Sequence, residues 1–287
     1  MKVLSLQSAV AYGHVGNSAA VFPLQRLGFE VWPVDTVQFS NHPGYGGWGG
    51  DVLPSDHVAR VVAGLEAAGV LSSCDAVLSG YLGAPATGDA VLAAVAAVKA
   101  ANPKAIYLCD PVIGDGEKGV YVQDGIPAFF AERALAVADV ITPNRFELEW
   151  LSGQPAPTLS AAAAAAGLLI TPQPSRPHAP ATVVVTGLEV NGGMASLAVT
   201  AEGAWAVRTP LLPFHPPLHG AGDALAALLL AHLLRGEAAP EALSLAVSSL
   251  WGVLDRTLTL GRRELALVAA QDEIALPSRL FPPLPVG

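Results

Sequence analysis

Short runs of apolar and β-branched residues recur along the chain, and most of them end at Gly, Pro, Asp or Ser. Continuous apolar runs of this length are typical of strands that are buried on both faces of a parallel sheet. The pattern predicts such strands at residues 2–6, 30–34, 75–78, 104–109, 139–141 and 182–185.

Stretches with helical character lie between these runs, and they predict helices at residues 17–27, 55–68, 87–99, 128–137 and 143–151. The alanine run at 161–166 has strong helix propensity and predicts a further helix that packs closely on the sheet. Alternating strands and helices are the signature of an α/β fold. We therefore expect a central, mostly parallel sheet flanked by helices.

The pattern changes after residue 186. Two strand-like pieces at 194–200 and 204–208 are separated by Glu202-Gly203, which predicts a small antiparallel extension at one edge of the sheet. A helical region follows from residue 221 to about 258. We expect residues 173–180, with the isolated Arg176, to form an exposed connection, residues 276–287 to form a proline-rich tail, and residues 1–287 to make a single domain.

Composition narrows the functions that such a fold could serve. Apolar residues make up 52% of the 287 residues and charged residues 14%, and 24 acidic against 15 basic residues give a net charge of −9. That charge gives no electrostatic support for binding nucleic acid or an anionic membrane. The apolar segment at 224–234 contains His232 and is shorter than the ~20 residues that a bilayer needs. We expect a soluble, cytoplasmic protein.

One glycine-rich turn is the strongest candidate for chemistry. The segment His219-Gly220-Ala221-Gly222-Asp223 stands directly before an apolar helical stretch. Glycines let the backbone approach a ligand closely, and the free N–H groups at a helix start bind anions. A carboxylate beside a phosphate is repulsive at rest, and a role as general base for an attacking hydroxyl would explain its presence. The alternative is that Asp223 only caps the helix.

Two acidic residues follow the strand predicted at 104–109. Asp110 and Asp115 should therefore lie at the carboxyl edge of the sheet, where ligands of open α/β folds collect. Two acids near a phosphate indicate a divalent cation, and magnesium prefers a few carboxylates together with phosphate oxygens and waters. The alternative is that both residues are turn formers next to Pro and Gly.

A further polar pair marks the next helix start. Thr142-Pro143 predicts a helix in which Thr142 is the cap and Pro143 takes the first helical position. Asn144 and Glu147 are then neighbours on one face of that helix, again at the ligand edge. The alternative is an ordinary solvated helix face with a pair between Arg145 and Glu149.

Other nucleotide-binding patterns are absent or out of place. The sequence has no P-loop motif, and the glycines at 44–50 lie well beyond their strand and open no helix, as a dinucleotide fold would require. We expect a mobile loop there, whose Tyr45 and Trp48 cover a flat ligand. His14, His42 and His219 lack the spacing of a metal cluster, and each is expected to make a polar contact.

Several motifs occur in a recognisable order. They are Gln7-Ser8, Tyr12-Gly13-His14-Val15-Gly16-Asn17, the run at 36–42 (TVQFSNH), Ser79-Gly80-Tyr81, the turn at 109–112 (CDPV), Asn144 with Glu147, and Gly220-Ala221-Gly222-Asp223. Together, from residue 2 to about residue 275, they resemble a pyridoxal kinase of the ribokinase-like superfamily. Single motifs are common among related sugar and vitamin kinases, whereas the two amino-terminal segments are particular to the pyridoxal branch.

The resemblance implies a ribokinase-like fold and ATP-dependent phosphorylation of the 5′-hydroxymethyl group of pyridoxal. It implies that Asp223 is the catalytic base and that the amides of Gly220, Ala221 and Gly222 form the anion hole. The implied substrate pocket consists of Ser8, Val15, Val37, Phe39, His42 and Tyr81.

The resemblance also implies a place for the nucleotide. Asp110, Asp115, Asn144 and Glu147 are implied to hold magnesium and the ATP phosphates. Of these, Asp110, Asp115 and Glu147 are the implied metal ligands. Further nucleotide contacts are implied for Thr186, Thr209, Pro210, Leu211 and Leu212. Residues 116–125, with Tyr121, correspond to the lid of the family, and the family implies a homodimer and a monovalent cation such as K⁺.

One position departs from the family pattern. Relatives often carry Thr after His42, where it touches the substrate, and Pro43 stands here with neither a hydroxyl nor a backbone N–H. The preferred substrate is therefore left open. The alternatives are a hydroxymethylpyrimidine kinase, which shares the fold and the anion hole, a pyridoxal-binding protein without catalysis, and, more distantly, a nicotinamide oxidoreductase.

Overall fold

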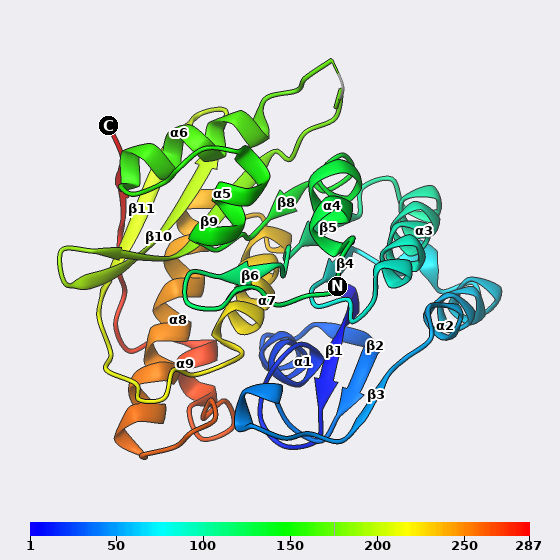
Figure 1. Cartoon of the computed structure of the whole chain (residues 1–287), viewed down its shortest axis with the longest axis horizontal. Coiled ribbons are helices and arrows are strands. Elements are labelled where there is room, and N and C mark those ends of the chain that lie inside the picture. The colour runs from blue at the N-terminus through cyan, green and yellow to red at the C-terminus, as the bar shows by residue number, and fades with distance from the viewer. Residues whose placement is uncertain (175) are drawn as a thin grey trace.

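A ten-stranded sheet forms the centre of the computed structural model, which describes residues 1–174 and 176–287 (Figure 1). The strand order is β12-β11-β10-β9-β8-β5-β4-β1-β2-β3. The six strands from β9 to β2 in this order pair in parallel. They are β1 (Lys2–Val10), β2 (Glu30–Phe39), β4 (Ala76–Ser79), β5 (Ile106–Cys109), β8 (Val140–Ile141) and β9 (Thr182–Val190). The predicted parallel core is confirmed.

Antiparallel strands extend both edges of this core. On one side β10 (Gly193–Thr200) and β11 (Gly203–Pro210) form the predicted hairpin. The segment expected to be a tail adds β12 (Pro283–Pro285) to β11. On the other side β3 (Gly50–Val52) pairs with β2, which the sequence did not indicate. The prolines of β12 are tolerated because it is an edge strand.

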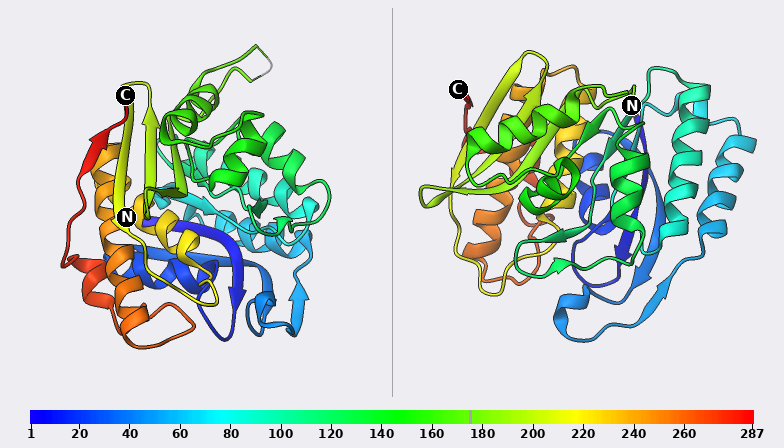
Figure 2. Two further views of the ribbon diagram at one scale, coloured as in Figure 1. Left: turned by 60° about the vertical axis from the view of Figure 1, so that its left-hand side comes forward. Right: turned by 45° about the horizontal axis from the view of Figure 1, so that its top comes forward.

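Helices cover both faces of the sheet, as Figure 2 shows. One hydrophobic cluster joins the sheet to α2 (Ser55–Ala67), α3 (Pro85–Ala101), α4 (Ile126–Phe129), α5 (Arg145–Ser152) and α6 (Leu159–Ile170). The other joins it to α1 (Asn17–Arg26), α7 (Ala221–Leu234), α8 (Ala239–Thr259) and α9 (Gln271–Ala275). Within the described residues, no helix has both the length and the apolar character needed to cross a membrane.

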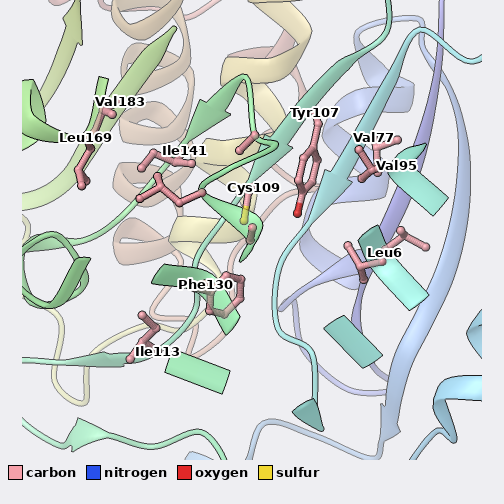
Figure 3. Packing of buried hydrophobic residues seen from close by; sticks show 14 of the residues in the cluster. Leu6, Val77, Val95, Tyr107, Cys109, Ile113, Phe130, Ile141, Leu169 and Val183 are labelled. Carbon is pink, nitrogen blue, oxygen red and sulfur yellow. The ribbon is translucent and has the colours of Figure 1, made fainter. Parts of the chain in front are cut away.

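The buried strands explain why their sequences are continuously apolar. Successive residues of a strand point to opposite faces, so Val77 packs in one hydrophobic cluster and Leu78 in the other. Figure 3 shows the first cluster, with Tyr107 and Cys109 of β5 among the labelled side chains. Tyr107 is fully buried, and its hydroxyl lies 2.8 Å from Ser79 Oγ, which satisfies the one polar group of the ring.

Three predicted helices differ from the observed ones. The region from 221 to 258 contains two helices, because α7 ends at Leu234 and Gly236 takes a positive φ of 90°. The helix expected at 128–137 begins earlier, as α4, and continues into a π-helical turn at Phe130–Ala134. The helix expected at 143–151 begins at Arg145, because Asn144 is its N-cap.

Arg176 does not belong to an exposed connection. It is only 8% exposed, and its guanidinium donates hydrogen bonds to the carbonyl oxygens of Leu168, Leu169 and Thr171. These carbonyls have no partners within α6, so the arginine caps the end of that helix. The rest of the predicted connection is exposed at Gln173 and His178, and its residue 175 lies outside the described residues.

Candidate active site

The carboxyl ends of the parallel strands meet at one edge of the sheet, and the main cavity lies there. It has a volume of about 660 Å³. Its walls include residues of β1, β2 and β9 and residues of the segments that follow β1, β2, β4, β5 and β8. The turn before α7 and the first turn of that helix complete them. The sheet reverses its direction of winding between β1 and β4, which is where open α/β sheets bind ligands.

The predicted residues gather in this cavity from distant parts of the sequence. Its lining includes Ser8, Val15, Val37, Phe39, His42, Tyr81, Asp110, Asp115, Tyr121, Asn144, Glu147, Thr186, Gly220, Ala221, Gly222 and Asp223. Each predicted substrate, lid and catalytic residue is among them.

The start of α7 is built by close contact between two backbones. Gly220 is the N-cap with φ 84°, and a Cβ atom there would lie 1.7 Å from the carbonyl oxygen of His14. Gly16, with φ 54°, approaches Ser8 so closely that a Cβ atom would lie 2.1 Å from its carbonyl oxygen. Only glycine fits either position. The loop after β1 therefore lies directly against the N-terminal turn of α7.

Asp223 lies in the first turn of α7 and faces the cavity. Burial raises the pKa of its carboxyl group above the usual value, although the backbone N–H groups of Gly16 and of Asp223 itself act in the opposite direction. The N-cap of α7 is Gly220, which has no side chain to cap the helix. A negative charge near a helix N-terminus is favourable, so helix stability and a cavity-facing carboxylate are compatible here.

Asp110 and Glu147 are two buried carboxyl groups that also line the cavity. Burial raises the pKa of Asp110 well above its usual value, and the neighbouring carboxylates of Glu147 and Asp223 raise it further. Thr142 Oγ1 donates a hydrogen bond of 2.9 Å to Asp110 Oδ1. Thr142 therefore serves the carboxylate of Asp110, and the prediction that it caps the next helix is wrong.

Glu147 holds the loop after β5 in place. Its Oε1 accepts from the backbone N–H groups of Ile113 (2.9 Å) and Gly114 (3.5 Å), and its Oε2 accepts from Asn144 (2.8 Å). Asn144 Oδ1 in turn accepts from the N–H of Glu147, which completes a capping box. Burial raises the pKa of Glu147 to about 7, because these N–H groups offset the cost of burial only in part.

The ion pair that was the alternative for this helix is also present. Arg145 Nε lies 3.2 Å from Glu149 Oε1 on the exposed side of α5. The exposed side of α5 therefore carries the ion pair, and its N-terminus carries Asn144 and Glu147, which line the cavity. Both interpretations of this helix are correct, each for a different side of it.

Two of the acidic residues have oxygens that could bind magnesium. Among the residues that the structure describes, no three His, Cys, Asp or Glu side chains form a group that could hold a metal ion. Both oxygens of Glu147 already accept backbone hydrogen bonds, and Asp115 Oδ1 accepts from the N–H groups of Glu117 and Lys118. Asp110 and Asp115 each retain a second oxygen, which fits an ion that is otherwise bound by phosphate oxygens and waters.

Part of the cavity wall is apolar and suits a flat ring. Val37 and Phe39 of β2 are almost fully buried and line it, and Tyr81 stands on the neighbouring wall. Trp48 packs against Phe39 with ring centroids 4.1 Å apart, but it does not line the described cavity. Tyr45 points away and donates a hydrogen bond to Glu264. Neither aromatic residue lines the two cavities in this structure, and their covering of a bound ligand stays a prediction.

A second, smaller cavity continues from the first. It has a volume of about 300 Å³ and shares Thr186, Ala221 and Gly222 with the main cavity. The five residues for which further nucleotide contacts were implied all line it, namely Thr186, Thr209, Pro210, Leu211 and Leu212. Its other walls are mainly apolar, so an elongated ligand could place a charged end at the N-terminus of α7 and an apolar end here.

Several cavity residues had no functional role in the sequence analysis. Val10 and Leu218 had no motif to indicate them. Lys118 lies between β6 (Gly114–Asp115) and β7 (Gly119–Val120), which form a two-stranded hairpin beside the cavity. Lys118 is the only Lys or Arg among the described cavity-lining residues. The sequence could have indicated this residue, because Lys118 is the only basic residue of the lid segment predicted at 116–125.

Comparison with known proteins assigns the family. A family model described as phosphomethylpyrimidine kinase matches residues 59–267. The chain is 53% identical to the pyridoxal kinase PdxY of Rubrobacter xylanophilus, over 98% of this chain and 96% of that protein. It is 52% identical to the pyridoxal kinase PdxY of Deinococcus radiodurans, over 97% and 94%.

Solved structures agree with these sequence relatives. The pyridoxal kinase from Leishmania donovani in complex with ADP and pyridoxine superposes with a TM-score of 0.90 at 30% identity, covering 100% of this chain and 99% of that one. The coverage includes every segment that lines the two cavities. The chain therefore belongs to the phosphomethylpyrimidine kinase family and, within its ribokinase-like fold, to the pyridoxal kinases.

Proposed function

We propose that the chain transfers the γ-phosphoryl group of ATP to the 5′-hydroxymethyl group of pyridoxal and so serves vitamin B6 salvage. The observation that carries this proposal is the position of Asp223, which faces a cavity with an apolar wall on one side and a second cavity on the other. Relatives at 53% and 52% identity are pyridoxal kinases, and a structural neighbour at 30% identity binds ADP and pyridoxine.

The proposed roles follow from the chemistry of each group. Asp223 accepts the proton of the hydroxymethyl group as its oxygen attacks the γ-phosphorus, and ADP leaves on the opposite side. Its raised pKa suits a base that must take and release a proton. The backbone N–H groups of Gly220, Ala221 and Gly222 donate hydrogen bonds to the phosphoryl oxygens. These bonds stabilise the negative charge on those oxygens during transfer.

The acidic residues of the cavity are proposed to bind the magnesium ion that accompanies the nucleotide. A magnesium ion there would offset charge on the phosphate oxygens. Asp110 and Asp115 have the free oxygens to hold it, with waters completing its shell. Glu147 and Asn144 act through the loop at 113–114, which they fix by hydrogen bonds. Glu147 is thus a positioning residue, which revises its implied role as a ligand.

The remaining parts of the proposal concern the nucleotide base and the lid. The apolar walls of the second cavity would hold the adenine, with Thr186 at the junction and residues 209–212 along one side. Tyr121 and Lys118, on the hairpin at 114–121, would cover the reacting groups and exclude water.

The broader expectations of the family complete the proposal. We propose that residues 1–287 act as one ribokinase-like domain in the cytoplasm. The enzyme is proposed to be a homodimer that uses a monovalent cation such as K⁺.

A hydroxymethylpyrimidine kinase is the second candidate, because the matching family model bears the name of phosphomethylpyrimidine kinase. Both activities would use Asp223 and the same amides. The two candidates differ only in the ring that fills the apolar side of the cavity, so a comparison of substrates separates them.

The test is an assay of ADP release with pyridoxal, pyridoxine, pyridoxamine and hydroxymethylpyrimidine measured side by side. The proposal expects pyridoxal to be phosphorylated with a higher kcat/KM than the pyrimidine, and the reverse order would overturn it.

Asp223→Asn should lower kcat about 10²- to 10⁴-fold with nucleotide binding retained. Near-normal turnover by that variant would reduce Asp223 to a helix-stabilising residue, and vitamin binding without any turnover by the unaltered protein would indicate a carrier.

A further inference from the structure

Two histidines from different elements stack on each other in the cavity wall. The ring centroids of His42 and His219 are 3.6 Å apart and their planes differ by 24°. His42 belongs to the loop after β2, and His219 directly precedes Gly220, the N-cap of α7. Both side chains line the main cavity. The stack therefore joins the substrate side of the cavity to the anion-binding turn.

The stack depends on a missing side chain. A Cβ atom at Gly44 would lie 2.7 Å from His219 Nε2 and 2.9 Å from His42 Nδ1, so the two rings occupy space that any other residue would fill. Pro43 and Gly44 bring no hydrogen-bonding side chain to this wall. The imidazole rings are therefore the polar side chains that this loop region presents to a ligand.

Both rings are neutral near pH 7. The N–H of Gly44 donates to His42 Nδ1 at 3.0 Å, which puts the proton of that ring on Nε2. Burial lowers the pKa of His42 to about 4, and His219 and Lys118 contribute to the shift. Burial also lowers the pKa of His219, and the positive charge of Lys118 lowers it further. Neutral imidazoles can donate a hydrogen bond without adding charge.

We propose that His219, supported by its stack on His42, is a specificity-determining residue that donates a hydrogen bond to the substituent at position 4 of the substrate ring. The inference rests on the proposed function, in which Asp223 acts on the hydroxymethyl group at position 5. His219 comes directly before the amides that hold the transferring group, so it lies beside position 5. The neighbours of that position are 4 and 6, and only position 4 carries a polar group.

The forms of vitamin B6 differ at this position. Pyridoxal carries a formyl group, pyridoxine a hydroxymethyl group and pyridoxamine an aminomethyl group that is cationic at neutral pH. The formyl and hydroxyl oxygens accept a hydrogen bond from a neutral imidazole. An ammonium nitrogen has no lone pair, so it cannot accept the hydrogen bond from that N–H. The pair therefore favours pyridoxal and pyridoxine over pyridoxamine.

The decisive experiment pairs one substitution with one change in the substrate. The kcat/KM values of the unaltered enzyme and of His219→Leu are measured with pyridoxine and with 4-deoxypyridoxine, which has a methyl group at position 4. One net hydrogen bond predicts that the unaltered enzyme favours pyridoxine about tenfold. In His219→Leu this ratio should fall to about one, because the leucine cannot donate.

Controls keep the outcome decisive. His57 lies on α2 outside both cavities, so His57→Leu should keep the tenfold ratio. His219→Gln, which retains an N–H donor, should keep most of it. If His219→Leu is too slow to assay, calorimetric binding of the two compounds in the presence of ADP gives the same ratio.

The result that overturns the inference is a ratio that is the same in His219→Leu as in the unaltered enzyme, or a ratio of one in the unaltered enzyme. Both leave the proposed function intact. Failure of the unaltered enzyme to phosphorylate any form of vitamin B6 would instead refute the proposed function.

Discussion

The ionisation of Asp223 should set the acid side of the pH profile. Burial raises its pKa above 3.8, and a base is active only when it is deprotonated. We therefore expect kcat/KM for pyridoxal to fall, as pH falls, at a pH above the usual range of an aspartate. A pH–rate profile at saturating ATP checks this. An acid limb at or below pH 3.8 would contradict it.

Lys118 should neutralise charge during phosphoryl transfer. Four carboxyl groups line the main cavity, from Asp110, Asp115, Glu147 and Asp223, and Lys118 is the one Lys or Arg that faces them among the described lining residues. A positioned group that stabilises transition-state charge contributes about 10²-fold or more in kcat. We expect Lys118→Met to lower kcat by about that factor, with a smaller change in the KM for pyridoxal.

A matched control for that prediction is Lys104→Met, because Lys104 is exposed and lies just before β5, away from its carboxyl end. It should behave like the unaltered enzyme, and Lys118→Arg should recover part of the lost rate because it restores the charge. Turnover of Lys118→Met within twofold of normal would exclude a role for this side chain in the reaction.

Helix α5 connects the stability of an element to the geometry of the site. Asn144 Oδ1 caps the helix through the N–H of Glu147, and Asn144 Nδ2 donates to the carbonyl oxygen of Gly114 at 2.8 Å. Loss of an N-cap side chain costs about 1 kcal/mol. Asn144→Ala should therefore lower the free energy of unfolding by about 1–2 kcal/mol and lower kcat as well, because the loop that carries Asp115 loses an anchor.

Urea unfolding and steady-state kinetics test both halves of that prediction. Thr158 caps α6 in the same way, through the N–H of Ala161, but lies outside both cavities. Thr158→Ala should thus cost similar stability with unchanged kcat. If the two variants lose activity equally, the contact with Gly114 has no particular importance for catalysis.

Sequence patterns located elements better than they located the ends of elements. The pair Asn144 and Glu147 was predicted to face the ligand edge, and it does, but the helix was predicted to begin at Pro143. The difference arises because Thr142 bonds to Asp110, which is 32 residues away in the chain. The burial of Arg176 was missed for a similar reason. It depends on hydrogen bonds from the guanidinium to carbonyl oxygens at the end of α6, which have no partners within that helix.

At the scale of the whole molecule, the parallel core and the place of the site were predictable. Apolar runs fix the buried strands, and parallel strands bring their carboxyl ends to one edge, so Ser8, Asp110 and Asn144 had to meet there. The edge strands β3 and β12 were not predictable, because three-residue strands form only against an existing edge. The stack of His42 on His219 was also hidden, since it requires Gly44 to meet a residue from the far end of the chain.

The segment around β12 packs against α8 and, through β12, pairs with the edge of the sheet. Phe281 is 5% exposed, its N–H donates to Ser248 Oγ at 3.0 Å, and its carbonyl accepts from Ser244 Oγ at 2.6 Å. Its ring packs edge-on against Trp251 of α8, with centroids 5.2 Å apart. Truncation of a buried phenylalanine costs about 3–5 kcal/mol, so we expect Phe281→Ala to lower the free energy of unfolding by about 3 kcal/mol, near the low end because the site is close to the surface.

Leu284 is the matched control for that substitution, because it lies three residues away in β12 and is half exposed. Its truncation to Ala should change stability by no more than about 0.5 kcal/mol, as is usual for surface positions. The midpoints of urea unfolding measure both variants. If the two losses are equal, β12 holds the sheet edge through its backbone alone. If Phe281→Ala alone is costly, the buried ring is what fastens this part of the chain to α8, and the strand pairing with β11 follows from it.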